Sequence, residues 1–391
     1  MTPWLVRLWR SNINRTLARH QKITHIAAEG LEHVRAAVER GAGVLLTPNH
    51  SFHYDSYVMI EMGHRIGRPL HFLTAWQVFA MSKPFERRVL QWHGCYSINR
   101  EANDLQAFKA SIEILRESPF PLIIFPEGDI YHCNDRVTPF REGAAAIALS
   151  AAKKGPREIV AVPCALKCFY VQDPTPELAK LMTRLEDSLH WRPRTELSLE
   201  ERIYKFADGL LALKEIEYLG DPQRGNVVDR ARALADVILK QLEGKYGLAA
   251  KGIIPERVKE CRRAIIKALE VDGKTPAELA ALSGDMNEVF LVIQLFSYPA
   301  DYIRERPTIE RIAETLDKFE EDVLRADFPG IRGERHAIVK FGEPIPVAAE
   351  RDNRHAVSDL TDKLETRVQA LLDEINAARP ASGGCKSPEE N

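Results

Sequence analysis

Hydrophobic positions between residues 41 and about 172 alternate between short apolar runs and stretches with helical periodicity. Runs rich in β-branched residues predict strands, and apolar residues three or four positions apart predict amphipathic helices. The pattern predicts strands at 44–47, 70–73, 95–98, 122–125 and 159–162, and helices at 53–66, 75–91, 103–117 and 141–154. Asn103 is suited to cap the third helix. This alternation is typical of an α/β architecture.

From residue 173 to about 334 the pattern is nearly all helical, with helices expected at 198–218, 226–246, 255–271, 275–283, 286–298 and 308–326. A strand at 337–341 and a helix at 357–377 follow. We therefore expect an α/β domain from 30–172 and 335–378, with a mixed, mostly parallel sheet flanked by helices. Residues 173–334 form an inserted all-helical domain, and the Gly-, Ser- and Pro-rich tail 379–391 is predicted to be disordered.

The N-terminal segment, 1–29, is basic and amphipathic. Leu5, Trp9, Ile13 and Leu17 recur every four residues, and Trp4 and Leu8 widen this stripe. Residues 1–22 hold five cationic side chains and no acid: Arg7, Arg10, Arg15, Arg19 and Lys22. Such a helix can lie in a membrane interface, or it can pack on its own domain with its arginines in solvent. The segment alone leaves both readings open.

The composition narrows the class of protein. The chain has 391 residues, 45% of them hydrophobic and 28% charged, which excludes a disordered or collagen-like protein. A net charge of -2 gives no global field for binding nucleic acid. Six cysteines are scattered without CxxC pairs, which favours a reduced cytosolic chain over a disulfide framework or zinc site. No run reaches the ~18 consecutive apolar residues of a membrane span, and Arg7 and Arg10 interrupt any signal-peptide core.

The first candidate for chemistry is the pair His50 and Asp55, which follows the strand at 44–47 and Pro48. On one continuous helix, five steps of 100° would place the two side chains about 140° apart. For a contact, His50 must therefore lie in the turn before the helix and Asp55 in its first turns. An imidazole held by a carboxylate is fixed in one tautomer and becomes a general base for a hydroxyl.

Two further blocks end at the same predicted edge of the sheet. Glu127 and Gly128 follow the apolar strand at 122–125, where open α/β sheets bind ligands, although an ordinary turn would have the same sequence. Arg100 follows the strand at 95–98 and is suited to bind phosphate, although such an arginine is often only a solvated charge. Pro163 interrupts a fourth apolar run.

In this order the four blocks resemble the glycerolipid acyltransferase superfamily, typified by 1-acylglycerol-3-phosphate acyltransferases. The resemblance covers roughly 30–172, less strongly 337–347, and not the helical block. It implies that His50 is the general base and that Asp55 orients it, so that no covalent enzyme intermediate is needed. It implies an acceptor site of Asn49, Arg100, Glu127 and Gly128, and an acyl side shaped by Val162 and Pro163. It implies no metal or redox cofactor, and acyl-CoA or acyl-carrier protein as the donor.

The chain departs from the family pattern after Gly128. The family usually has Thr-Arg there, and this chain has Asp129 and Ile130. An anion in place of a cation weakens phosphate binding by Coulomb's law. Either Arg136 or Arg141 replaces the missing cation, or the acceptor is not a phosphomonoester.

The resemblance thus predicts an acyltransferase that acylates a lysophospholipid, with 1-acylglycerol-3-phosphate as the leading acceptor. Two alternatives remain: an acyltransferase for another lipid acceptor, and a non-catalytic lipid-binding or scaffold protein. The expected partners are the lipid acceptor, the thioester donor and a membrane surface, and not nucleic acid. The expected location is the cytoplasm, peripherally on the inner face of a membrane.

Overall fold

The computed structural model describes residues 1–100, 104–298, 301–348 and 354–378, which divide into two compact units. The first comprises Met1–Pro174, Thr308–Glu314 and Gly330–Asn391, and the second Thr175–Pro307 and Thr315–Pro329. The expected helical block, 173–334, differs from the second unit at 173–174, 308–314 and 330–334, which cluster with the first. Asn103 and the tail 379–391 lie outside the described residues.

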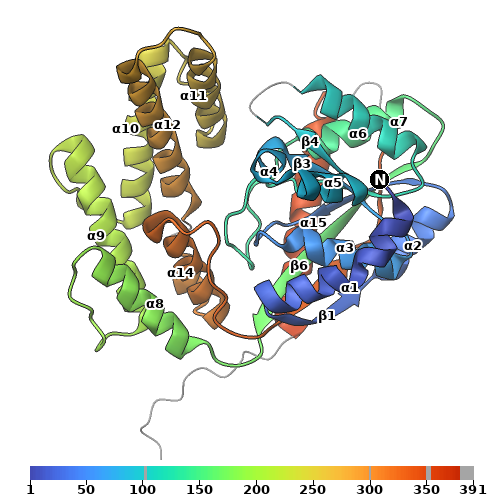
Figure 1. Ribbon diagram of the computed structural model, residues 1–391, viewed down its shortest axis with the longest axis horizontal. Helices are drawn as coiled ribbons and strands as arrows, with labels where there is room; N and C mark the ends of the chain where they lie inside the picture. Colours follow the sequence, from blue (N-terminus) through green and yellow to red (C-terminus); the bar gives the residue numbers. More distant parts are fainter. Residues whose placement is uncertain (101–103, 299–300, 349–353, 379–391) are drawn as a thin grey trace, which may run out of the picture. The chain divides into compact units, whose positions relative to one another are not determined.

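The first unit contains a mixed, mostly parallel sheet covered by helices, as the sequence predicts (Figure 1). Within the described ranges the sheet has eight strands in the order β1-β7-β6-β2-β5-β3-β4, with β8 also paired to β6. Only the β6–β7 and β6–β8 pairs are antiparallel. The strands are β1 (Ile23–Glu29), β2 (Gly43–Pro48), β3 (His71–Ala75), β4 (Cys95–Ile98), β5 (Leu122–Ile123), β6 (Ile159–Tyr170), β7 (Arg335–Phe341) and β8 (Ile345–Pro346).

Each face of the sheet packs into its own hydrophobic core. Successive side chains of β2 alternate between the faces, so Val44 and Leu46 enter one core and Leu45 enters the other. The first core includes residues of α1 (Pro3–His20), α2 (Leu31–Glu39) and α3 (Asp55–Ile66). The second includes residues of α6 (Leu105–Glu117), α7 (Gly143–Lys153) and α15 (Ala356–Ala378). Burial on both sides fixes the register of β2 and therefore the position of the loop that follows it.

Several elements differ from the sequence prediction. The helix expected at 75–91 is divided into α4 (Trp76–Met81) and α5 (Pro84–Trp92), because a proline fits the first turn of a helix but not its interior. Asp104 caps α6 by accepting a hydrogen bond from the Ala107 N–H. The strand expected to end at 162 continues through Pro163 to Tyr170, and the N-terminal segment contains the unexpected strand β1 after α1.

The second unit is helical throughout its described residues. Its elements are α8 (Thr175–Ser188), α9 (Leu199–Leu219), α10 (Val227–Tyr246), α11 (Ile254–Leu269), α12 (Pro276–Ser297), α13 (Tyr302–Glu305) and the later part of α14 (Ile309–Leu324). The two helices expected at 275–283 and 286–298 are the single helix α12. Among the described residues, one apolar helical stretch, which includes α12, is long and hydrophobic enough by composition to cross a membrane. A core helix of a soluble protein can have the same length and composition; here 22% of the apolar window is buried, and α12 contributes Val289 and Val292 to a buried core.

Arginines paired with buried glutamates join successive helices of the second unit. Arg202 on α9 binds Glu186 on α8, Arg230 on α10 binds Glu215 on α9, and Arg257 on α11 binds Glu243 on α10. Each arginine lies four residues after its helix cap, and the three are spaced 28 and 27 residues apart. The same link therefore recurs at three successive helix-to-helix connections, α8–α9, α9–α10 and α10–α11.

Candidate active site

The loop between β2 and α3 brings His50 and Asp55 together. β2 ends at Pro48, His50 lies in the loop, and Asp55 is the first residue of α3. Nδ1 of His50 lies 3.0 Å from Oδ2 of Asp55. The same carboxylate oxygen accepts hydrogen bonds from the backbone N–H groups of Ser51 (2.7 Å) and Phe52 (2.8 Å). The loop thus wraps around one buried carboxylate, which holds the imidazole in a fixed orientation.

The His50 ring is further restrained by packing. It stacks on the ring of Phe125, with 4.1 Å between ring centroids. The side chain of Asp55 is only 2% exposed, whereas that of His50 is 18% exposed. When Nδ1–H donates to the carboxylate, Nε2 carries the free lone pair and can accept a proton from a substrate.

Glu127 lies beneath the same loop and contacts its backbone. Its Oε1 accepts a 2.6 Å hydrogen bond from the His50 N–H, and its Oε2 accepts a 3.0 Å hydrogen bond from the Thr138 N–H. The side chain is 2% exposed. Burial raises the pKa of this carboxyl to about 8, although both N–H donors oppose the rise. Each oxygen of the Glu127 carboxyl thus binds a backbone N–H group of the protein.

Two arginines flank Gly128. Arg100 donates to the carbonyl oxygen of Gly128, and the guanidinium of Arg141 packs against its Cα. Gly128 has φ +74°, and a Cβ there would lie 2.6 Å from Nε of Arg141. A glycine is therefore required both for the backbone conformation and for the approach of the arginine. Arg100 is half-buried and Arg141 is exposed, so their guanidiniums can meet a ligand from solvent.

The other residues of this loop are placed as follows. Asp129 is half-buried next to Gly128, and its Oδ1 accepts a hydrogen bond from the Ile130 N–H. Arg136 is half-buried further along the loop. Of the two arginines that the sequence offered as replacements for the missing family cation, Arg141 is the one that contacts Gly128.

Asn49 is bonded to the strand that neighbours the loop. Its side chain is fully buried, its Oδ1 accepts from the Leu166 N–H, and its Nδ2 donates to the Leu166 carbonyl and to Oγ of Ser51. The amide continues the hydrogen-bond ladder on β6 after β2 has ended at Pro48. The Asn49 side chain therefore attaches the His50 loop to the sheet.

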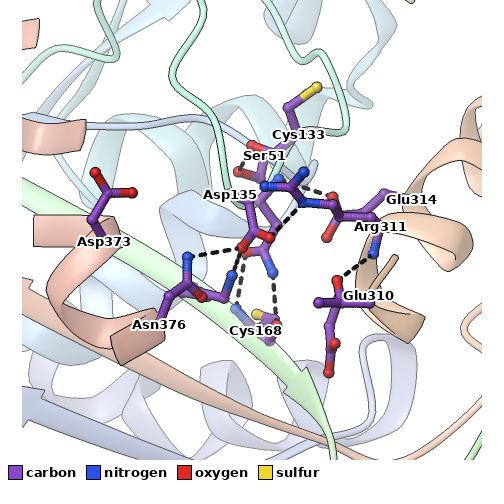
Figure 2. A network of polar contacts seen from close by, with 12 residues as sticks. Ser51, Cys133, Asp135, Cys168, Glu310, Arg311, Glu314, Asp373 and Asn376 are labelled. Carbon is purple, nitrogen blue, oxygen red and sulfur yellow. Dashed lines mark hydrogen bonds and ion pairs between the residues drawn. The ribbon is translucent and has the colours of Figure 1, made fainter. Parts of the chain in front are cut away.

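Sequence reasoning missed Ser51 and Thr138. Ser51 Oγ donates to the Cys133 carbonyl at 2.9 Å (Figure 2), and the Thr138 N–H holds Glu127. Neither residue stands out in a sequence pattern. The Ser51 contact joins loops 82 residues apart, and Thr138 lies 11 residues after Glu127 without a recognisable spacing.

Comparison with protein families identifies the first unit. Residues 25–167 match the family model described as Acyltransferase. This region is therefore similar to an acyltransferase domain. The match confirms the resemblance drawn from the four motif blocks and supports acyltransferase activity in general. No curated protein matches the chain.

The matched range contains every residue of the candidate site. His50, Asp55, Arg100 and Glu127 all lie inside the matched range, as does most of β6. The second unit, β7 and α15 lie outside it. The first unit therefore also includes two segments, starting at Thr308 and Gly330, that begin more than 130 residues after the matched range ends.

Proposed function

We propose that the protein transfers a fatty acyl group from a thioester donor to the hydroxyl group of a lysophospholipid, with 1-acylglycerol-3-phosphate as the leading acceptor. The observation that carries this proposal is the 3.0 Å contact between His50 and a buried, backbone-bound Asp55. A binding or scaffold protein has no need of an imidazole oriented in this way.

The proposed reaction proceeds in two proton transfers. Nε2 of His50 takes the proton from the acceptor hydroxyl while the oxygen attacks the thioester carbonyl carbon. The C–S bond then breaks, the ester forms, and the imidazolium returns its proton to the leaving thiolate. Asp55 stabilises the imidazolium and does not take the proton itself. This route needs neither a covalent enzyme intermediate nor a cofactor, and acyl-CoA or acyl-carrier protein would supply the thioester.

The residues around Gly128 bear on the identity of the acceptor. Arg100 and Arg141 meet at this glycine, and an arginine can bind phosphate through several N–H groups at once. Asp129 places a negative charge beside them and weakens the binding of a doubly charged phosphomonoester. A phosphodiester or an uncharged lipid alcohol is therefore the second candidate acceptor.

We place the reaction at a membrane surface, on the cytoplasmic side. The stripe of α1 expected to face either lipid or protein packs inward through Ile13 and Leu17, whereas Trp4 and Leu8 are 65% and 69% exposed. Further exposed apolar side chains lie on α4 and α5, and we call the whole set the α1–α5 patch: Trp4, Leu8, Trp76, Val78, Met81 and Phe85. An exposed apolar patch on a basic surface is typical of proteins that dock on anionic lipid.

The decisive experiment measures acyl transfer by purified protein. Wild-type protein, His50→Ala and His53→Ala would be assayed with acyl-CoA and with acyl-carrier protein against lysophosphatidate, glycerol 3-phosphate, lysophosphatidylglycerol and a long-chain alcohol. We expect transfer by wild type and His53→Ala and a loss of at least a thousandfold for His50→Ala. Undiminished turnover by His50→Ala would refute the mechanism, and transfer only to acceptors without a phosphomonoester would replace the leading acceptor.

A further inference from the structure

The C-terminal half of β6 has one edge that no strand covers within the described sheet. β2 pairs with β6 only as far as Pro48 opposite Cys164, whereas β6 continues to Tyr170 along β7 on its other edge. Backbone groups of alternate residues point to opposite edges of a strand, so Leu166, Cys168 and Tyr170 face the edge that β2 has left. Buried backbone groups need partners.

Side chains supply those partners. Asn49 binds both backbone groups of Leu166. Asn134 binds both backbone groups of Cys168, at 3.0 Å to its N–H and 2.7 Å to its carbonyl. Glu310, on the first turn of α14, accepts a 3.3 Å hydrogen bond from the Tyr170 N–H. Three side chains thus continue the ladder, and the last comes from the end of the helical insertion.

The same turns of α14 hold the loop that carries Asn134. Glu314 accepts a 3.0 Å hydrogen bond from the Asn134 N–H. Arg311 donates through Nε to Oδ2 of Asp135 at 2.7 Å, and Asp135 also binds Lys167 and Asn376 (Figure 2). All of these charged side chains are buried, and two carboxylates balance two cations. Such a network holds its side chains in fixed positions, because the loss of one charge leaves its partner buried and unpaired at a high cost in free energy.

The loop from 127 to 138 forms hydrogen bonds at two points with the segment that carries His50. Ser51, the neighbour of His50, donates its Oγ to the Cys133 carbonyl, directly before Asn134. The second contact is made by Glu127, at the start of the loop. Glu127 accepts a hydrogen bond from the N–H of His50 and another from the N–H of Thr138, at the end of the loop. The position of the His50 backbone therefore depends on the loop from 127 to 138.

We propose that Arg311 and Glu314, on α14, are positioning residues for His50 and act through this loop. The proposal rests on the proposed acyl transfer, in which His50 is the base. Both residues lie far beyond the range 25–167 that matches the acyltransferase family, and the first turns of α14, which belong to the first unit, complete the surroundings of the candidate site. Residues 308–314 are then required for activity even if they never touch the substrate.

The test compares Arg311→Met with Arg230→Met in the full-length protein. The two arginines are matched, since each is 9% exposed and pairs with a buried carboxylate, but Arg230 binds Glu215 within the second unit. We expect both variants to lose thermal stability. Only Arg311→Met should lower kcat for acyl transfer, by at least tenfold at a temperature where both remain folded, with less than a twofold change in KM for the donor. Equal kcat in the two variants would overturn the inference.

Glu314 offers a test by rescue. Glu314→Ala removes the acceptor for the Asn134 N–H, and Glu314→Gln keeps an oxygen at that place. We expect Glu314→Ala to lose at least tenfold in kcat and Glu314→Gln to retain most of it. Equal losses in both variants would show that the hydrogen bond to Asn134 does not matter and would overturn the role of Glu314.

A separate readout distinguishes this inference from the proposed function. The imidazole ¹⁵N resonances of His50, assigned by their loss in His50→Ala, report its hydrogen bonding whether or not acyl transfer is observed. We expect them to shift in Arg311→Met and to stay unchanged in Arg230→Met. If wild type transfers no acyl group but this shift is found, the proposed function fails and the positioning role stands. Unchanged resonances in Arg311→Met would overturn the positioning role.

Discussion

The backbone N–H of His50 donates a 2.6 Å hydrogen bond to Oε1 of Glu127. The carboxyl of Glu127 is almost fully buried, and its other oxygen is held by the Thr138 N–H. The family resemblance assigns Glu127 to the acceptor site, but here its carboxyl is hydrogen-bonded to the backbone of His50, the proposed base. A change at Glu127 is therefore expected to act on the geometry of His50 as well as on substrate binding.

The raised pKa of Glu127 predicts a pH-dependent stability. Because its pKa is about 8 in the folded protein against an ordinary value of 4.5, the folded state binds this proton more tightly than the unfolded state. The stabilisation is complete below about pH 4.5 and is lost as the pH rises through 8. Urea unfolding from pH 5 to pH 9 should show the free energy of unfolding of wild type falling relative to Glu127→Gln, by at most ~1.4 kcal/mol per pH unit. Parallel curves would contradict the prediction.

Replacing Asp55 by Asn is expected to lower kcat by about 10²–10⁴-fold, because the amide cannot fix the tautomer in which Nε2 is the free base. The Asn oxygen can still accept from the Ser51 and Phe52 N–H groups, so the loop should stay folded. Steady-state kinetics and circular dichroism together check this. A variant with unchanged kcat would show that the contact with His50 serves only the structure.

Gly128→Ala tests whether Arg141 helps to bind the acceptor. The new Cβ would meet Nε of Arg141 at 2.6 Å and would displace the guanidinium. Gly67→Ala is the control, because Gly67 has a similar positive φ (84°) but no atom within 4 Å of the added Cβ. Both should cost about 1–2 kcal/mol in stability. Only Gly128→Ala should raise KM for a phosphorylated acceptor, and an equal KM in both variants would exclude Arg141 from the acceptor site.

The sequence predicts much of the first unit because its signals are local. Each strand that precedes a candidate residue lies near its expected position, since burial on both faces leaves a continuous apolar run such as 44–47. The spacing of His50 and Asp55 requires a loop before a helix, and β2, the loop and α3 lie in that order. Periodicity and a short spacing suffice for such elements.

The partners of the site could not be predicted because they are distant in sequence. Arg311 binds Asp135 across 176 residues, and Asn134 binds the backbone of Cys168 rather than another side chain. Neither contact leaves a pattern in a single sequence. The expected boundary at residue 334 placed Arg311 in the helical block for the same reason: a helix pattern shows where a helix begins, and not which unit its first turns pack against.

The repeated arginine–glutamate pairs of the second unit predict a strong asymmetry between single and double substitutions. Arg202 and Glu186 are both nearly fully buried and form a two-point contact. Arg202→Met leaves an unpaired buried carboxylate and should cost about 3–5 kcal/mol of unfolding free energy. The double variant Arg202→Met with Glu186→Leu should recover most of that loss. Chemical denaturation measures both, and an equally unstable double variant would show that the pair is not the source of the stability.

The α1–α5 patch predicts binding to anionic lipid vesicles. Trp4 and Met81 are 65% and 79% exposed, and Phe85 packs its ring 6.5 Å from that of Trp9, which joins α5 to α1. Basic residues of the same elements, among them Arg7, Lys83 and Arg88, add attraction to negative headgroups. Burying an apolar side chain contributes roughly 1.5–3 kcal/mol, so Trp4→Ser with Met81→Ser should weaken binding to phosphatidylglycerol vesicles by at least tenfold.

Ile253→Ser is the matched control for this measurement, because Ile253 is 62% exposed but lies in the second unit. Vesicle sedimentation at low and high salt separates the apolar from the electrostatic contribution, since salt screens only the latter. If the patch docks on lipid, the double variant should keep only weak, salt-sensitive binding, and Ile253→Ser should bind as strongly as wild type. Equal binding by all three proteins would show that the exposed apolar side chains of α1, α4 and α5 do not meet the membrane.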